Sequence, residues 1–85
     1  MMSENKIVEV IWLDAMSTND HLPLSVAESI TPMERRSVGY LIKSDEDCVI
    51  ITYGFITDFL EGKTACDQAL VIPKGMIIKV EELND

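Results

Sequence analysis

The chain has 85 residues, 47% of them hydrophobic, and its 15 acidic and 7 basic side chains give a net charge of −8. This length allows one domain, residues 1–85, and so acidic a chain is a poor candidate for direct nucleic-acid binding, which needs a basic surface. No apolar run approaches the roughly 20 residues that span a bilayer, and the first residues lack the pattern of a signal peptide. We therefore expect a cytoplasmic protein without membrane contact.

Five short apolar segments predict five β-strands, because each is rich in β-branched side chains and is bounded by turn residues. They are Ile7–Leu13, Val38–Ile42, Val49–Phe55, Ala69–Ile72 and Met76–Val80. The first segment is apolar at nearly every position, which is typical of a strand that is covered on both faces. Within the second and third segments, Gly39 and Gly54 predict a bulge or a sharp bend.

The first connection, residues 14–34, is long for so small a domain, and long connections often carry function. Residues 25–30 can form a short helical turn, which Pro32 stops. We expect a tight turn at Ser44–Asp47, which makes a hairpin of the second and third strands.

Two further connections follow in the second half of the chain. We expect residues 56–68 to be a loop in which Phe59 and Leu60 face inward. Pro73 cannot donate to a strand ladder, so the fourth strand ends there and a brief 3₁₀ turn precedes the last strand.

The resulting order is strand, long loop, hairpin, loop, strand, tight turn, strand. This order predicts a mainly β fold, a small five-stranded barrel of the Src-homology or Sm type, whose long first loop holds at most a short helical turn. A barrel of this size has one interior, so some of Ile7, Ile11 and Leu13 need cover from the long loop or from another subunit. We expect a homo-oligomer for that reason.

The chain also resembles a family of small proteins encoded by phages and prophages. The residues that carry the resemblance are Val8–Ser17, Val38–Leu41 and Ile72–Ile77. The resemblance implies a viral protein in the cytoplasm of an infected bacterium, and it implies no catalytic residue, because the family has no assigned activity. Small viral proteins of this kind often act as counter-defence or host-takeover factors.

A candidate ligand site combines aromatic rings, which stack on bases, with an adjacent arginine pair, which binds phosphate or carboxylate through its guanidinium forks. Its residues are Trp12, Asp14, Ser17, Arg35, Arg36, Tyr40 and Tyr53. Each also has a structural interpretation. Trp12 is then a core side chain and Asp14 caps a turn, the arginines form ion pairs with Glu34, Asp14 or Asp20, and the tyrosines pack against each other across the hairpin.

Catalysis and metal binding receive little support from the sequence. His21 as a general base needs Ser17 or Asp20 as a partner, and an exposed loop histidine is the simpler interpretation. The single histidine and the separated Cys48 and Cys66 do not form a zinc motif, and a disulfide between these cysteines is not expected in a leaderless chain. We expect no catalytic residues, no metal and no cofactor.

Two functions remain open at this stage. The first is a non-enzymatic binding protein that sequesters a nucleotide second messenger, as a viral counter-defence factor would. The alternative is an acidic protein–protein inhibitor or adaptor that acts on a basic host protein.

Overall fold

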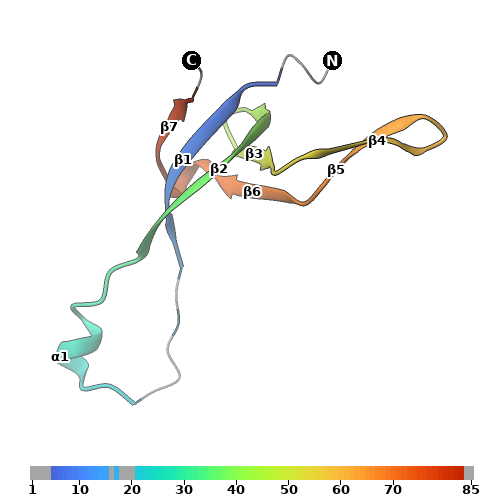
Figure 1. The fold of residues 1–85 in the computed structure, drawn as a ribbon. Coiled ribbons are helices and arrows are strands. Elements are labelled where there is room, and N and C mark those ends of the chain that lie inside the picture. The colour runs from blue at the N-terminus through green and yellow to red at the C-terminus, as the bar shows by residue number, and fades with distance from the viewer. Residues whose placement is uncertain (1–4, 16, 18–20, 84–85) are drawn as a thin grey trace.

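The computed structural model describes residues 5–15, 17 and 21–83. Its strands form a five-stranded antiparallel sheet in the order β6-β3-β2-β1-β7 and a separate two-stranded ribbon of β4 and β5 (Figure 1). The mainly β architecture is thereby confirmed. The edges of the described sheet are β6 and β7, and no ladder between these two strands closes it into a barrel. The elements are β1 (Ile7–Asp14), α1 (Leu24–Ala27), β2 (Met33–Ser44), β3 (Cys48–Thr52), β4 (Phe55–Leu60), β5 (Lys63–Cys66), β6 (Ala69–Pro73), the 3₁₀ turn η2 (Lys74–Met76) and β7 (Ile77–Glu82).

The hydrophobic core lies on one face of the five-stranded sheet, because successive side chains of a strand point to opposite faces. We call this the core face. Trp12, Leu41, Leu70 and Ile77 are partly buried against the core and extend it. The core itself consists of the buried residues Val8, Val10, Val49, Ile51 and Ile72.

The opposite side of the sheet, which we call the outer face, also carries apolar side chains. The strand registers place Ile7, Val38 and Val71 on this face, where they are 40%, 45% and 57% exposed. Ile11 and Leu13 lie on the same face and are half-buried. The expectation that β1 is apolar on both faces is correct, but part of its outer side is open to solvent.

Of the bulge or sharp bend that we expected at Gly39, the bulge is wrong. The β1–β2 ladder runs without a shift through Val8 and Gly39, and the irregularity in β2 lies between Leu41 and Lys43. The glycine is needed because a Cβ atom at this position would lie 2.6 Å from the backbone oxygen of Thr52 on β3. Close approach of a neighbouring strand is the second physical reason for a glycine within a sheet.

The segment that we expected to be a loop, residues 56–68, is mostly an antiparallel hairpin of β4 and β5. Its two-residue turn is Glu61–Gly62, with φ angles of 55° and 76°. Positive φ at both positions is the type I′ geometry that matches the twist of a hairpin. The expected inward orientation is wrong for Leu60, which is 63% exposed, and the side chain of Phe59 lies outside the described residues.

A buried hydroxyl marks the junction between the sheet and this hairpin. The predicted strand Val49–Phe55 is interrupted at Tyr53 and Gly54, so that β3 ends at Thr52 and β4 begins at Phe55. The Thr52 side chain is fully buried. Its Oγ1 lies 2.7 Å from the backbone oxygen of Gln68 and 2.9 Å from that of Gly54. The hydroxyl therefore connects the segment between β3 and β4 with the segment between β5 and β6.

The tight turn between β2 and β3 forms as the sequence predicts. The Asp45 carboxylate accepts hydrogen bonds from the backbone N–H groups of Asp47 and Cys48 at 2.8 and 3.0 Å. These two bonds, with a smaller effect of Lys43, hold the pKa of Asp45 below its ordinary value. The hydrogen bond and the charge of Asp45 in turn raise the pKa of Lys43.

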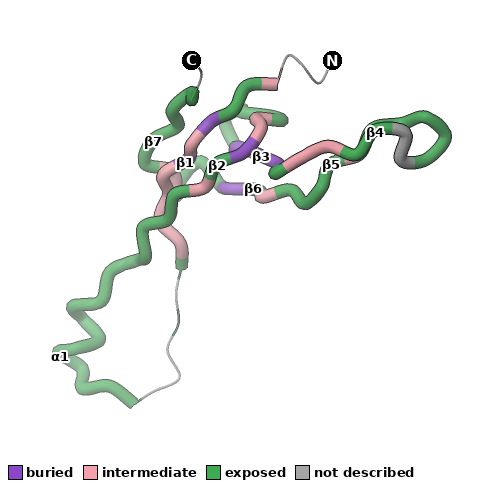
Figure 2. The backbone as a smooth tube through the Cα atoms, viewed as in Figure 1, coloured by how far each residue is buried: buried purple, intermediate pink, exposed green. Residues whose placement is uncertain are grey.

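Two segments project from the sheet, and they give the chain an elongated shape (Figure 1). We call residues 21–32, which include α1, the loop arm, and residues 55–66, which form β4 and β5, the distal hairpin. The radius of gyration is 16.8 Å and the extents are 56 × 29 × 23 Å, whereas a compact domain of this length has a radius of gyration of about 12 Å. Both projections are exposed along most of their length (Figure 2).

The loop arm leads away from the sheet, so its described part does not cover the outer face of β1 (Figure 1). Its short helix α1 overlaps residues 25–30, where we expected a helical turn, but begins one residue earlier, and none of its residues is buried. Among the described residues, no helix is long and apolar enough to cross a bilayer.

Candidate functional site

The site begins at Trp12, near the end of the part of β1 that packs on the core. Trp12 lies directly opposite Arg35 in the β1–β2 ladder, and residues that are opposite in a ladder point to the same face. The indole Nε1 donates a hydrogen bond to the Ser37 hydroxyl at 3.0 Å. Trp12 packs against the core and is half-buried, so part of this residue remains accessible to solvent.

Arg35 and Asp14 form the charged part of the same site. The Arg35 Nε atom lies 2.8 Å from the Asp14 Oδ2 atom, and the two side chains are 53% and 32% exposed. Both lie on the core face, next to Trp12 in the ladder. Of the two interpretations of Asp14, the ion pair with Arg35 is the one that the structure shows. This contact uses Nε, one of the three nitrogens of the guanidinium group.

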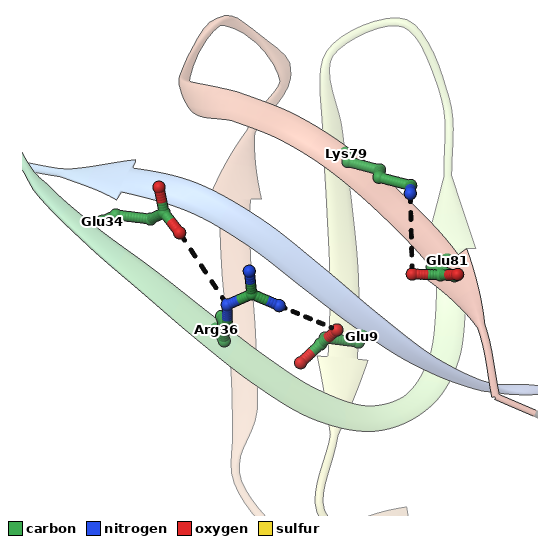
Figure 3. Close-up of polar contacts among 5 residues, drawn as sticks. All are labelled: Glu9, Glu34, Arg36, Lys79 and Glu81. Atoms are coloured by element: carbon green, nitrogen blue, oxygen red, sulfur yellow. Dashed lines mark hydrogen bonds and ion pairs between the residues drawn. The ribbon is translucent and has the colours of Figure 1, made fainter.

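Arg36 points to the opposite face of the sheet from Arg35. Its guanidinium nitrogens lie 3.5 Å from a Glu9 carboxylate oxygen and 3.8 Å from a Glu34 carboxylate oxygen (Figure 3). A further exposed pair on that face joins Lys79 and Glu81 at 3.7 Å (Figure 3). The two arginines are therefore neighbours in the chain but do not converge on one ligand position within this chain.

The two tyrosines do not pack against each other across the hairpin. Tyr40 lies opposite Thr52 in the β2–β3 ladder, and its ring packs on that of Phe55, with 5.4 Å between the ring centroids and an interplanar angle of 51°. Tyr53 follows the end of β3 and is 54% exposed. Because Tyr40 lies on the outer face, it is not part of the Trp12 site.

The remaining sequence candidates lie in the first connection. Ser17 and His21 are both exposed, and Asp20, the partner considered for His21, lies outside the described residues. In the part of the chain that the structure describes, no group of three His, Cys, Asp or Glu side chains is arranged to hold a metal ion. Cys48 is half-buried and Cys66 is exposed, and both are free thiols.

We define the Trp12 cluster as Trp12, Asp14, Arg35 and Ser37. Sequence reasoning missed Ser37, and it also missed Glu9, the closest partner of Arg36. Both omissions have one cause: the polar residues Glu34–Ser37 hid the fact that β2 begins at Met33. Once the strand is extended to Met33, a two-residue period places Arg35 and Ser37 on one face and Arg36 on the other.

The cluster places a half-buried indole ring opposite a guanidinium group that is paired with a carboxylate. An indole ring stacks on planar ligands, and a guanidinium group binds phosphate or carboxylate oxygens. These two capacities side by side suit a ligand that has both an aromatic ring and an anionic group.

A comparison of the chain with protein-family models, with curated proteins and with solved structures finds no match.

Proposed function

We propose that this chain is a non-enzymatic binding protein whose Trp12 cluster holds a small anionic ligand of the nucleotide class. The observation that carries the proposal is the position of Trp12 opposite Arg35 on one face of the sheet, with the Arg35 Nε held at 2.8 Å by Asp14. Holding such a ligand requires no catalytic group. The proposed ligand role therefore belongs to Trp12, Asp14 and Arg35.

In this proposal the base stacks on the accessible part of the indole ring and the phosphate accepts hydrogen bonds from Arg35. Stacking of a base on an aromatic side chain contributes about 1–3 kcal/mol. The carboxylate of Asp14 pairs with the guanidinium, although it also repels a phosphate, as does the net charge of −8. Salt screens this repulsion between the acidic chain and the phosphate. Raising the ionic strength is therefore expected to weaken binding less than it would if the chain only attracted the ligand.

The biological part of the proposal follows from the resemblance to phage proteins. A viral protein that holds a nucleotide immune messenger would lower its free concentration in the infected cell. This counter-defence role needs tight binding and many copies of the protein, and it needs no turnover of the messenger.

We also propose that the sheet belongs to the Src-homology or Sm type of small barrel. The order β6-β3-β2-β1-β7 and the short 3₁₀ turn between β6 and β7 support this assignment. In this architecture the two edge strands approach each other around the core face.

The experiment is isothermal titration calorimetry against a panel of cyclic and linear nucleotides. Arg35→Ala and Arg36→Ala form a matched pair, since each removes one guanidinium group and only Arg35 lies on the face of Trp12. Loss of a charge-assisted hydrogen bond of about 1.5–3 kcal/mol corresponds to a roughly ten- to hundredfold weaker Kd for Arg35→Ala. Arg36→Ala is expected to bind as the unmodified chain does.

Three outcomes of the titration are informative. Weaker binding by Arg35→Ala alone supports the Trp12 cluster. Equal binding by both variants rejects the assignment of the site. If the unmodified chain binds no nucleotide below about 100 µM, which is a weak affinity of roughly −5.5 kcal/mol, the nucleotide proposal is rejected.

A second candidate is the acidic protein–protein inhibitor or adaptor. The observation that favours it is the exposure of Leu24 and Leu60, at 75% and 63%, on segments that project from an acidic chain. Large exposed apolar side chains mark surfaces that bind other proteins. If this candidate is correct, the chain forms a one-to-one complex with a defined partner protein. Substitution of Leu24 or of the acidic side chains is then expected to weaken that complex.

A further inference from the structure

The loop arm and the distal hairpin are both apolar and uncovered. On the loop arm, Leu24, Val26 and Ile30 are 75%, 45% and 40% exposed. On the distal hairpin, Ile56 and Leu60 are 41% and 63% exposed. A soluble domain rarely leaves so many large apolar side chains in water unless they meet a partner.

Neither projection has enough internal contact to be stable by itself. The distal hairpin is a separate two-stranded sheet, and a lone two-stranded hairpin is at best marginally stable in water. The helix α1 has four residues and none of them is buried, whereas isolated helices shorter than about 12 residues are marginal. The loop arm and the distal hairpin therefore each need a further surface to pack against, and that surface must be present whenever the chain is folded.

The exposed area of the chain is large enough for a permanent interface. It exposes 6444 Å², whereas a compact monomer of 9.5 kDa exposes about 5,000 Å². The excess, roughly 1,400 Å² per chain, exceeds the about 800 Å² per partner of a standard interface. It lies in the range of obligate homodimers, whose interfaces bury about 2,000 Å² or more in total.

The charge distribution permits two copies of this acidic chain to associate through these segments. The loop arm contains one acid, Glu28, and no lysine or arginine, and the distal hairpin contains Asp58, Glu61 and Lys63. The other twelve of the fifteen acidic residues lie outside these two segments, three of them in the turn Asp45–Asp47 and two at Glu81–Glu82. Burying the two arms brings few like charges together.

We infer that the loop arm and the distal hairpin are the self-association surface of this protein, and that each packs against a second copy of the chain. The outer face supplies a complementary apolar surface, since Ile7, Val38 and Val71 are exposed there. A second copy is the partner that is present wherever the chain is folded. This inference does not depend on the nucleotide proposal, because its test is made without ligand.

The first measurement is the mass of the unmodified chain in solution by light scattering, with circular dichroism as a check on folding. A dimer or larger assembly at micromolar concentration is expected. A folded species of 9.5 kDa at that concentration overturns the inference. An assembly in which mass spectrometry under denaturing conditions finds a different polypeptide overturns it as well.

The second measurement uses Leu24→Asp on the loop arm and Leu60→Asp on the distal hairpin. The matched control is Ser44→Asp, which adds the same charge at an exposed position at the end of β2, outside both arms. Each arm variant is expected to reduce the mass at equal protein concentration, and the control is expected to retain it. If both arm variants keep the mass of the unmodified chain, the arms are not the interface.

Hydrogen exchange of the unmodified chain keeps the test decisive if the arm variants fail to fold. The backbone amides of β4 and β5 are expected to be protected at high protein concentration and to lose protection on dilution. Exchange of these amides at the rate of an unstructured peptide at every concentration overturns the inference.

Discussion

Trp12 and Arg35 face each other across the β1–β2 ladder, while Arg36, the next residue in the chain, lies on the other face of the sheet. The alternation of side chains along a strand has this consequence for any adjacent pair. The two arginines are adjacent in the sequence, but they form two separate sets of ion pairs. Arg35 pairs with Asp14, and Arg36 pairs with Glu9 and Glu34. Trp12 lies on the same face of the sheet as the Arg35–Asp14 pair and on the opposite face from Arg36.

The contribution of Trp12 to stability is expected to be intermediate. Full removal of a buried large aromatic costs about 3–5 kcal/mol, and Trp12 is half-buried, so Trp12→Ala is expected to destabilise the fold by about 2–3 kcal/mol. Urea unfolding followed by circular dichroism measures this at fixed protein concentration. Ser37→Ala, which removes only the partner of the indole N–H, is the control and is expected to cost about 1 kcal/mol. An unchanged midpoint for Trp12→Ala would show that the ring does not pack on the core.

Gly39→Ala is expected to be strongly destabilising, because the new Cβ would lie 2.6 Å from the Thr52 backbone oxygen. Relief of this overlap requires β3 to move, and forcing extra atoms into a packed site costs about 1–3 kcal/mol or more. Gly75→Ala is the matched control, since its Cβ would meet nothing within 4 Å. The denaturation midpoint is expected to fall for Gly39→Ala only, and equal midpoints would contradict the close approach of β2 and β3.

Thr52→Val is expected to loosen the junction between the sheet and the distal hairpin. The substitution keeps the shape of the side chain but removes the hydroxyl, whose shortest contact is the 2.7 Å hydrogen bond to the Gln68 backbone oxygen, whereas the Gly54 oxygen keeps the bond from the Asp67 backbone N–H. An unsatisfied buried polar group costs about 1–3 kcal/mol. Thr52→Ser, which keeps the hydroxyl, is expected to cost less than Thr52→Val. The reverse order, measured by chemical denaturation, would argue that packing of the methyl group dominates.

The turn at Asp45 makes stability depend on pH in the acid range. The pKa of Asp45 is lowered by the N–H groups of Asp47 and Cys48. Its contribution is therefore complete above the ordinary aspartate pKa of about 3.9 and is lost as the pH falls through the lower folded-state pKa. Titration of the carboxyl carbon by NMR measures this pKa directly. In Asp45→Asn this part of the pH dependence is expected to disappear, whereas in Glu46→Gln it is expected to remain.

The local sequence pattern correctly predicted the elements that are determined by residues adjacent in the chain. The turn at Asp45 forms because a carboxylate accepts from the two N–H groups that follow it, and Pro73 ends β6 as expected. The hairpin of β4 and β5 was missed because its turn, Glu61–Gly62, is not the Asn-Gly or Asp-Gly pair that usually indicates type I′ geometry. The beginning of β2 was missed because Glu34–Ser37 are polar on both faces, and no apolar alternation is visible there.

The sequence by itself determined that the chain is mainly β, where most strands lie, and which aromatic and basic side chains are available for binding. Only the tertiary structure decided which of them meet, because strand register fixes the face of every side chain, and one residue of shift exchanges the faces. It also decided that the loop arm extends away from the sheet and leaves apolar surface uncovered. The cover of such a surface depends on contacts between residues distant in the chain, which no local pattern specifies.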